Sequence, residues 1–399
     1  MHVDKLNSRE FDVLVVGGGL VGMSCALALS RQGMSVGLLE SRSGPETPQS
    51  SISGQDWDSR IYAISPSNAE WLSSLGVWQH VDAGRVCPIA QMQIFGDADS
   101  SHLKFDASEA YIDQLGFIVE SRQLEQALLA ELSKSDVSLM SGVAARSAVF
   151  SENHAEMHLS DQCRLEARLL VAADGASSWL RNQADIAIST HDYHQMGVVA
   201  NFETELPHDN VAYQWFSDDG ILAWLPLPGN RISMVWSAHE QFAKSMLELQ
   251  AESLSEKVGR QGGMTLGALK LLTGARAFPL RQQTAATLVK PMLALVGDAA
   301  HTVHPLAGQG VNLGFRDVKV LAETLCARGQ HQSCGDHMLL RRYERARKLD
   351  LLEMQCVTKG LSGLFSHSGV FVRKLRNWGL SLTDRQARVK KYLMNQAIR

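Results

Sequence analysis

The spacing of apolar and polar residues divides the first forty positions into three elements. Phe11 to Val16 is a short, valine-rich apolar run of the kind found in buried parallel strands. The glycines of Gly17 to Gly22 end it, Leu20 to Gln32 has the small and apolar residues of a helix, and Gly33 suits the helix end. Met34 to Glu40 is a second strand. The pattern therefore predicts a strand–helix–strand unit and not a signal peptide or membrane helix.

The pattern changes to short runs in the middle of the chain. Three such runs are separated by Asp-Asp-Gly and Pro-Gly-Asn turn signals and predict an antiparallel meander: Val211 to Phe216, Ile221 to Leu227 and Arg231 to Ser237. Each run has one tryptophan: Trp215, Trp224 and Trp236. Packing within the sheet explains some of them, and an apolar pocket for an aromatic ring is the alternative for the others.

Helical spacing returns on either side of a last buried strand. Gln241 to Val258 has the apolar periodicity of one amphipathic helix. Met292 to Val296 is an apolar strand, and helices are expected from Asn312 onward. The basic residues are concentrated at the end of this region, since residues 341–399 contain 14 Lys and Arg but only 4 Asp and Glu.

Composition narrows the class of protein. With 399 residues, 45% of them hydrophobic and 20% charged, the chain is an ordinary globular protein of two or three domains. A net charge of −4 excludes a generally basic nucleic-acid binder. Six scattered cysteines without a CxxC pair indicate reduced thiols and a cytoplasmic protein.

The first chemical motif is the glycine turn between the two N-terminal strands. Gly17, Gly19 and Gly22 have the GxGxxG spacing, in which the first glycine makes the turn, the second admits a diphosphate and the third allows the helix to pack on the strand. Glu40 ends the second strand, where a carboxylate can accept hydrogen bonds from the hydroxyl groups of a ribose. Together they indicate nucleotide binding through the helix N-terminus.

Two further motifs follow apolar strands. Asp174 and Gly175, with Ser178 and Arg181, could hold a diphosphate or ribose, although an Asx turn that caps a helix accounts for them equally well. Gly297 to Asn312 begins with Asp298 at a strand end and brings two glycines, Gly308 and Gly310, close to the start of a helix. This segment can bind a polyol through the carboxylate and an anionic or carbonyl group through the backbone.

These three motifs, in this order, resemble the class A flavoprotein monooxygenases, the para-hydroxybenzoate hydroxylase-like group. The resemblance covers nearly the whole chain. Four further segments resemble the ubiquinone-biosynthesis hydroxylases within that group: Asp58 to Ser65, Leu75 to Trp78, Gly116 to Glu120 and Arg341 to Arg345.

The resemblance implies a doubly wound, Rossmann-like α/β domain that binds FAD, an interleaved antiparallel-sheet substrate domain and a helical C-terminal tail. The expected FAD domain is discontinuous, with residues 1–80, 110–182 and 285–330. The expected substrate domain comprises residues 81–109 and 183–284, and a basic helical region comprises residues 331–399.

The resemblance also assigns roles to residues. It implies that Gly17, Gly19, Gly22 and Glu40 bind the ADP half of FAD, and that Arg60 and Arg122 contact the flavin nucleotide chain. Asp174 would serve both FAD and a transient nicotinamide donor, and Asp298 would bind the ribityl chain. The segment Gly308, Gln309, Gly310 and Asn312 would face the flavin pyrimidine.

Two histidines, His301 and His304, lie within the third motif. A metal site there would need further ligands, and no acidic or histidine cluster in the sequence supplies them, so we expect no metal. We expect His301 to form local hydrogen bonds to the backbone. By the resemblance, His304 and Pro305 lie where the substrate approaches the flavin, which leaves a base role open for His304.

The implied reaction is hydroxylation of a polyprenylated phenol in ubiquinone biosynthesis, with oxygen transferred from a C4a-hydroperoxyflavin to the ring. It would use O2 and NAD(P)H or another reductase as electron donor. The alternatives are a hydroxylase of another aromatic compound, a nicotinamide dehydrogenase and a non-catalytic flavoprotein scaffold. The expected partners are ubiquinone-biosynthesis proteins. The basic C-terminal region suits the inner face of a membrane or an acidic partner protein, and a solvated helical face whose charge balances the acidic body accounts for it equally well.

Overall fold

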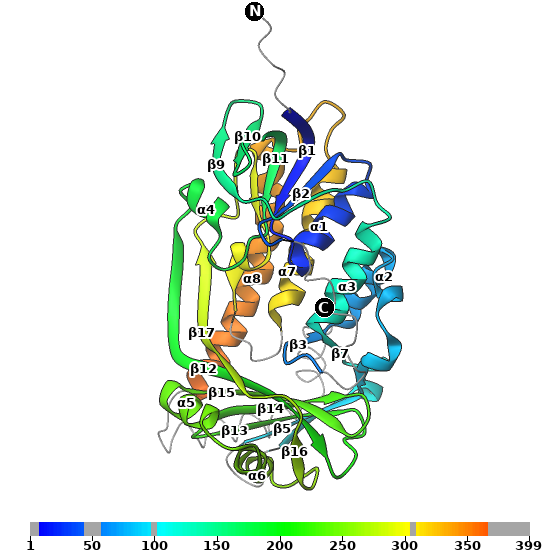
Figure 1. Ribbon diagram of the computed structural model, residues 1–399, viewed down its shortest axis with the longest axis vertical. Coiled ribbons are helices and arrows are strands. Elements are labelled where there is room, and N and C mark those ends of the chain that lie inside the picture. Colours follow the sequence, from blue (N-terminus) through cyan, green and yellow to red (C-terminus); the bar gives the residue numbers. More distant parts are fainter. Residues whose placement is uncertain (1–7, 44–56, 97–101, 304–308, 366–399) are drawn as a thin grey trace, which may run out of the picture.

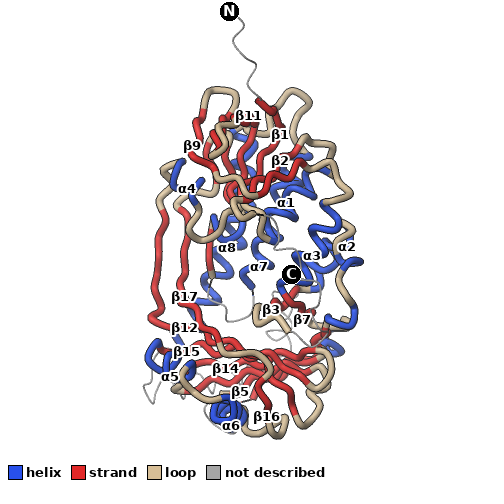
Figure 2. The backbone as a smooth tube through the Cα atoms, viewed as in Figure 1, coloured by secondary structure: helices blue, strands red, loops and turns tan. Residues whose placement is uncertain are grey.

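The computed structural model describes residues 8–43, 57–96, 102–303 and 309–365. Two large sheets lie at opposite ends of an elongated molecule, and helices α1, α3, α7 and α8 lie between them in the view of Figure 1. The tube in Figure 2 shows how two long strands, β12 and β17, run along one side from the lower sheet towards the upper one. The eight helices of the described residues are α1 (Leu20–Ser30), α2 (Pro66–Ser74), α3 (Ser121–Leu132), α4 (Trp179–Gln183), α5 (Glu240–Leu247), α6 (Ala251–Gln261), α7 (Gln309–Cys326) and α8 (His337–Phe365).

The upper sheet has a parallel centre. Its strand order is β18-β19-β11-β1-β2-β8, and β10 and β9 extend from β11 in an antiparallel hairpin. The strands are β1 (Ser8–Val16), β2 (Val36–Glu40), β8 (Ser138–Ser141), β9 (Ala145–Phe150), β10 (Ala155–Leu159), β11 (Arg164–Ala172), β18 (Val289–Lys290) and β19 (Leu293–Leu295). The predicted strand–helix–strand unit is confirmed as β1, α1 and β2. Because β1 is the central strand, Val13, Leu14 and Val15 are fully buried.

The lower sheet has nine strands and is almost entirely antiparallel. Its order is β20-β17-β12-β15-β14-β13-β5-β6, with β16 beside β12. The strands are β5 (Gln91–Phe95), β6 (His102–Asp106), β12 (Ile188–Thr204), β13 (Val211–Ser217), β14 (Gly220–Leu227), β15 (Arg231–His239), β16 (Leu269–Leu271), β17 (Arg276–Ala285) and β20 (His301–Thr302). The predicted meander is confirmed as β13, β14 and β15.

The three meander tryptophans pack within this sheet. Trp224 and Trp236 are at most 1% exposed, so neither lines an open pocket. Trp215 is partly buried between Phe95 and Tyr213, with each pair of ring centroids 5.6 Å apart. For Trp224 and Trp236, packing within the core is therefore confirmed, and the alternative that they line a substrate pocket is wrong.

The expected single helix from Gln241 to Val258 is wrong. It is divided into α5 and α6, and Gln250 between them has an extended backbone. Both helices contribute buried residues to one apolar cluster under the lower sheet, Met246 from α5 and Val258 from α6, and Leu249 packs against the same cluster. The break changes the direction of the chain so that both helices cover the sheet, which sequence periodicity could not reveal.

A small third sheet lies between the two large ones. Its order is β3-β7-β4, and its strands are β3 (Ile61–Ile64), β7 (Gly116–Glu120) and β4 (Cys87–Ile89). Strand β7 leads directly into α3, so its end brings Glu120 and Arg122 close to the loop before β3. This sheet places the Asp58–Arg60 loop between the glycine turn of the upper sheet and the lower sheet.

Candidate functional site

Gly17 and Gly22 form the tight turn between β1 and α1. Gly17 has a φ of +110°, and a Cβ atom there would lie 2.4 Å from the carbonyl oxygen of Ala173. A Cβ atom on Gly22 would lie 1.8 Å from the carbonyl oxygen of Gly17. Both positions therefore admit only glycine, because the turn, helix α1 and strand β11 approach one another too closely for a side chain.

Gly19 differs from the other two glycines because there is open space where a side chain would lie. Among the described residues, a Cβ atom there would meet nothing within 4 Å, and no side chain caps the N-terminus of α1. The start of α1 therefore presents bare backbone and the positive end of a helix dipole. A diphosphate fits such a surface.

Glu40 lies at the end of β2 and contacts the same turn. Its Oε2 accepts a hydrogen bond of 2.7 Å from the backbone N–H of Gly18, and its Oε1 accepts one of 2.9 Å from the backbone N–H of Arg42. Partial burial opposes ionisation, but these bonds and the Arg42 side chain lower the pKa of the Glu40 carboxyl below its ordinary value. The side chain is therefore a charged acceptor beside the turn.

Asp174 caps a helix and still keeps one acceptor. Its Oδ2 accepts a hydrogen bond of 3.0 Å from the backbone N–H of Leu180, and Ser178 caps the N–H of Arg181 at 3.0 Å. One oxygen of the Asp174 carboxylate therefore has the helix-capping role that the sequence suggested. The other oxygen, Oδ1, is buried and has no hydrogen-bond partner among the described residues. A buried acceptor without a donor is expected where a ligand supplies the donor.

Arg181 connects this second motif to the third. Its guanidinium donates hydrogen bonds of 3.0 Å to the carbonyl oxygens of Ala176 and Ala299, and only 3% of the residue is exposed. Since Ala299 follows Asp298 directly, the arginine holds the Asp174 and Asp298 turns together. The sequence placed Arg181 in the motif but gave no sign of this connecting role.

Asp298 lies in a short 3-10 turn, Gly297–Ala299, after β19. Its side chain is exposed to solvent, yet protein atoms surround it closely enough for desolvation to raise its pKa, against the opposing effects of His301 and Arg60. The influence of Arg60 shows that the loop before β3 and the third motif belong to one electrostatic site. An accessible but crowded carboxylate of this kind is suited to accept hydroxyl donors from a ligand.

Within the described residues His301 bonds to a side chain of α7 and not to the local backbone, so that expectation is wrong. Its Nε2 lies 2.7 Å from Oδ2 of Asp317, a buried residue of α7. The partner is 16 positions away in sequence, so the local pattern could give no sign of it. Of the expected substrate-side residues, His304 and Pro305 lie outside the described residues, as does Gly308.

The start of α7 is fixed to the small sheet by Asn312. The Oδ1 atom of Asn312 accepts hydrogen bonds from the Ser65 backbone at 3.0 Å and the Asn68 side chain at 2.9 Å. Its Nδ2 donates to the carbonyl oxygen of Ala63 at 2.7 Å. The side-chain amide therefore positions the helix. A Cβ atom on Gly310 would meet no atom of the described residues within 4 Å, so bare backbone is available there for a ligand.

Asp58 brings the two predicted arginines together. Its carboxylate accepts hydrogen bonds from the backbone N–H groups of Arg60 at 2.9 Å and of Arg122 at 3.3 Å. The loop is held from below by Glu120, which is fully buried and accepts a 2.6 Å hydrogen bond from the backbone N–H of Asp58. Glu120 also accepts two hydrogen bonds, of 2.7 and 2.8 Å, from Arg85. The sequence did not reveal Arg85, because nothing in its neighbourhood indicates a partner 35 positions away.

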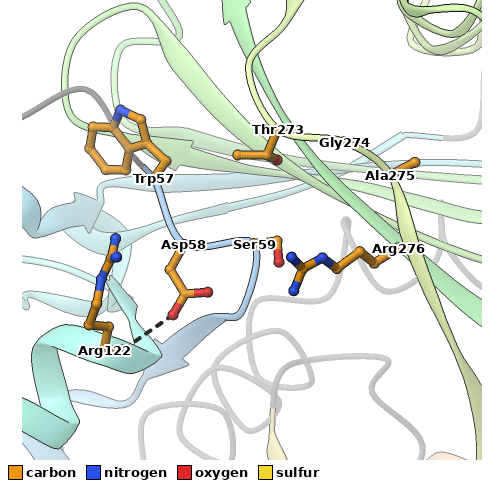
Figure 3. A pocket seen from close by; sticks show the side chains of 8 residues that line it. All are labelled: Trp57, Asp58, Ser59, Arg122, Thr273, Gly274, Ala275 and Arg276. Atoms are coloured by element: carbon orange, nitrogen blue, oxygen red, sulfur yellow. Dashed lines mark hydrogen bonds between the residues drawn. The ribbon is translucent and has the colours of Figure 1, made fainter. Parts of the chain in front are cut away.

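A pocket of about 360 Å³ opens beside this loop, where it faces the lower sheet (Figure 3). The loop contributes one wall together with Arg122, and the segment that leads into β17 contributes the other. The lining residues are Trp57, Asp58, Ser59, Arg122, Thr273, Gly274, Ala275 and Arg276. The lining is polar and includes two arginines.

These turns define a class of protein. It has a dinucleotide-binding fold in which a carboxylate acceptor lies at or beside each of three turns, and an antiparallel sheet is attached to that fold. The described residues contain no group of three or more His, Cys, Asp or Glu side chains that could hold a metal ion. The sequence matches the FAD binding domain family over residues 10–354.

Two curated relatives match over most of their length. Ubiquinone hydroxylase UbiL of Rhodospirillum rubrum is 35% identical, with 97% of this chain and 89% of the relative covered. The 3-demethoxyubiquinol 3-hydroxylase of Escherichia coli is 32% identical, with 98% and 100% covered. The crystal structure of p-nitrophenol 4-monooxygenase PnpA from Pseudomonas putida has a TM-score of 0.79 at 18% identity over 98% of this chain and 99% of that one, which shows the shared fold.

The chain belongs to the FAD-dependent hydroxylases of ubiquinone biosynthesis, within the class A flavoprotein monooxygenases. It is accordingly an FAD-dependent aromatic-ring hydroxylase that uses O2. The fold class predicted from the sequence, a doubly wound FAD-binding part with an antiparallel sheet, is confirmed.

Proposed function

We propose that this enzyme hydroxylates the ring of a polyprenylated phenol on the route to ubiquinone. The observation that carries the proposal is the match to UbiL and to the 3-demethoxyubiquinol 3-hydroxylase over at least 89% of each relative. Those proteins are named for hydroxylation of ubiquinone and of a demethoxyubiquinol. The antiparallel sheet that faces the three turns supplies the surface on which a bulky ring substrate would bind.

We propose the following roles in cofactor binding. The bare start of α1 at Gly19 holds the diphosphate, and Glu40 accepts hydrogen bonds from the adenosine ribose. Asp298 and the free oxygen of Asp174 accept hydroxyl donors, and the backbone at Gly310 faces the flavin ring. FAD supplies the oxygen-activating redox chemistry when bound, while these residues orient it and restrict water.

We propose that the basic pocket receives the electron donor rather than the prenyl chain. The guanidinium of Arg276 has no hydrogen-bond or ion-pair partner within the described ranges, and a Cβ atom on Gly274 would meet nothing within 4 Å. The carboxylate of Asp58 is already bonded to two backbone N–H groups. This surface suits the phosphates of NAD(P)H, which carry negative charge, and it does not suit a hydrocarbon.

Arg276→Gln should then raise the KM for NAD(P)H several-fold while FAD affinity stays the same. The control is Arg146→Gln, which changes an arginine that is not part of the pocket lining. Equal KM values in both variants would exclude the pocket as the donor site.

We propose peripheral attachment to the membrane, where a polyprenylated substrate resides. No helix of the described residues is long and apolar enough to cross a membrane. The surface that we propose for attachment is the exposed face of α8, which has Met338, Arg342, Arg345, Lys348 and Leu349. Other proteins of ubiquinone biosynthesis are proposed partners at that surface.

The test of the function is complementation. The chain would be expressed in bacterial strains that each lack one ring hydroxylase of ubiquinone biosynthesis, and the accumulated quinone intermediates identified by mass spectrometry. We expect ubiquinone to return in at least one strain and not with a Gly19→Trp variant expressed at the same level. If no strain regains ubiquinone although the protein is expressed and binds FAD, the substrate class proposed here is wrong.

A further inference from the structure

A buried carboxylate on α7 connects the third motif to the C-terminal helix. Asp317 is fully buried, and its Oδ2 accepts a hydrogen bond of 2.8 Å from the backbone N–H of Gly297 and lies 2.7 Å from Nε2 of His301. Its Oδ1 accepts a hydrogen bond of 2.6 Å from Nε of Arg347 on α8. His301 and Arg347 are each 2% exposed, so the whole cluster is shielded from water.

These contacts span the Asp298 turn. Gly297 and His301 lie on either side of Asp298, and both are held by the same carboxylate oxygen. Gly297 has a φ of +59°, a left-handed conformation that glycine adopts without strain, so the flexible backbone at this position does not by itself hold the turn in one geometry. The Asp317 carboxylate supplies that support by fixing both ends of the turn.

The same residue also sets the distance between the turn and α7. Helix α7 begins with the bare backbone at Gly310 and is fixed at Asn312, so its position is determined at one end by the small sheet. Asp317 lies five residues after Asn312, about one and a half turns further along α7, and joins the helix to the Asp298 turn. The two halves of the third motif, the carboxylate and the bare helix start, are thereby held in one relative position.

We propose that Asp317 is a positioning residue for flavin binding, acting through the Gly297–His301 turn, with Arg347 as its charge partner. Arg347 keeps Asp317 ionised in the absence of water, since a buried carboxylate needs both a compensating charge and hydrogen-bond donors. Burial alone would raise the pKa of Asp317, but His301, Arg347 and the Gly297 N–H lower it below the ordinary value. An ionised Asp317 can accept from all three donors at once.

The alternative is that the cluster only stabilises the fold. The chain offers a matched control, because Glu344 on α8 is also a buried carboxylate, 1% exposed, with bonds of 2.6 Å from the Thr287 hydroxyl and 3.0 Å from the Leu288 backbone. These two bonds fix Glu344 to the segment before β18 rather than to the Asp298 turn. A purely structural role would make the two carboxylates equivalent in any test of FAD binding.

The experiment compares Asp317→Asn and Glu344→Gln in the full chain. FAD dissociation constants would be measured by flavin fluorescence quenching, absorption spectra recorded for the FAD-loaded proteins, and melting temperatures measured without FAD. We expect both variants to melt at lower temperature. Asp317→Asn should weaken FAD binding at least tenfold and shift the flavin absorption bands, whereas Glu344→Gln should change the dissociation constant less than twofold.

His301→Ala is the second variant, in case Asp317→Asn does not fold, because it removes one tie to the turn and leaves the Asp317–Arg347 pair intact. It should also weaken FAD binding and shift the bands, and His301→Gln, which keeps a donor, should recover part of the affinity. Unchanged FAD affinity in His301→Ala and in any folded Asp317→Asn would overturn the proposal. The inference rests on the proposed place of the flavin at Asp298, but the test measures FAD binding and not hydroxylation, so it can fail without affecting the proposed substrate class.

Discussion

At the residue scale, the three glycines of the first turn have different tasks. Gly22→Ala should destabilise the fold by about 1–3 kcal/mol or more, because its Cβ atom would overlap the carbonyl oxygen of Gly17 at 1.8 Å. Gly19→Trp should leave the melting temperature of the FAD-free chain nearly unchanged, because the side chain would point into open space, but should abolish the yellow colour of the purified protein. Gly329→Trp, a substitution in the loop after α7, is the control for the added bulk. Stoichiometric FAD in Gly19→Trp would mean that the diphosphate does not lie at α1.

Asp298 allows a second prediction at this scale, on pH dependence. Folding raises its pKa, so the folded chain without FAD binds more protons than the unfolded chain between the two pKa values. The stability contributed by Asp298 is present below its unfolded pKa, about 4, and is lost as the pH rises through the folded pKa. Asp298→Asn should therefore gain stability relative to the wild type as the pH rises above about 4, in urea unfolding without FAD.

The same variant should bind FAD more weakly, by ~1–3 kcal/mol, because an amide is a poorer acceptor for the hydroxyl groups of the ribityl chain. Higher stability of the folded chain together with lower FAD affinity is the result expected when the native residue binds a ligand but destabilises the fold. Asp298→Asn with unchanged FAD affinity would leave Asp298 as part of the turn only.

At the element scale, a strand or helix could be predicted from the sequence where its own pattern of apolar residues and turn signals is enough to define it. The strand–helix–strand unit and the meander could be predicted because β1 is apolar throughout and the meander strands are divided by strong turn signals. The break between α5 and α6 could not, because both helices continue the same apolar spacing. The partners of His301, Glu120 and Asn312 could not be predicted either, since tertiary packing brings them together over separations of 16 to 249 residues.

Packing between α6 and the lower sheet gives a prediction at this scale. A Cβ atom on Gly262 would lie 2.2 Å from the ring of Trp224, which is fully buried. Gly262→Val should therefore destabilise the chain by roughly 1–3 kcal/mol through overpacking. Gly274→Ala, where the new atom would meet nothing within 4 Å, is the control and should be close to neutral. Urea unfolding of both variants measures the difference, and equal midpoints would contradict the tight contact.

At the scale of the whole molecule, the chain passes back and forth between the two large sheets. The upper sheet takes β1, β2, β8 to β11, β18 and β19, while β5, β6, β12 to β17 and β20 belong to the lower one. The order of the motifs along the sequence suggested this interleaving only through the family resemblance, because no local pattern specifies which strands share a sheet. The exact boundaries of the FAD, substrate and C-terminal regions remain a prediction.

The proposed membrane attachment is also a property of the whole molecule, because it depends on which basic side chains are exposed on its surface. In the described part of α8, Arg347 is buried against Asp317, so it cannot face a lipid surface. Arg342, Arg345 and Lys348 are exposed beside Leu349, which is 70% exposed. Each basic residue near an anionic bilayer contributes about 1 kcal/mol, and an adjacent apolar side chain adds to this by insertion.

The double variant Arg342→Glu and Arg345→Glu should therefore bind vesicles that contain anionic lipid at least roughly tenfold more weakly than the wild type, since two favourable charges become repulsive. The control, Arg260→Glu with Lys270→Glu, makes the same change in net charge at residues that are exposed elsewhere, on α6 and β16. Co-sedimentation at low and high salt measures both, and binding of the wild type should fall as salt rises. If the two double variants lose binding equally, net charge and not the α8 face is responsible. If the wild type binds neutral vesicles just as well, the attachment is not electrostatic.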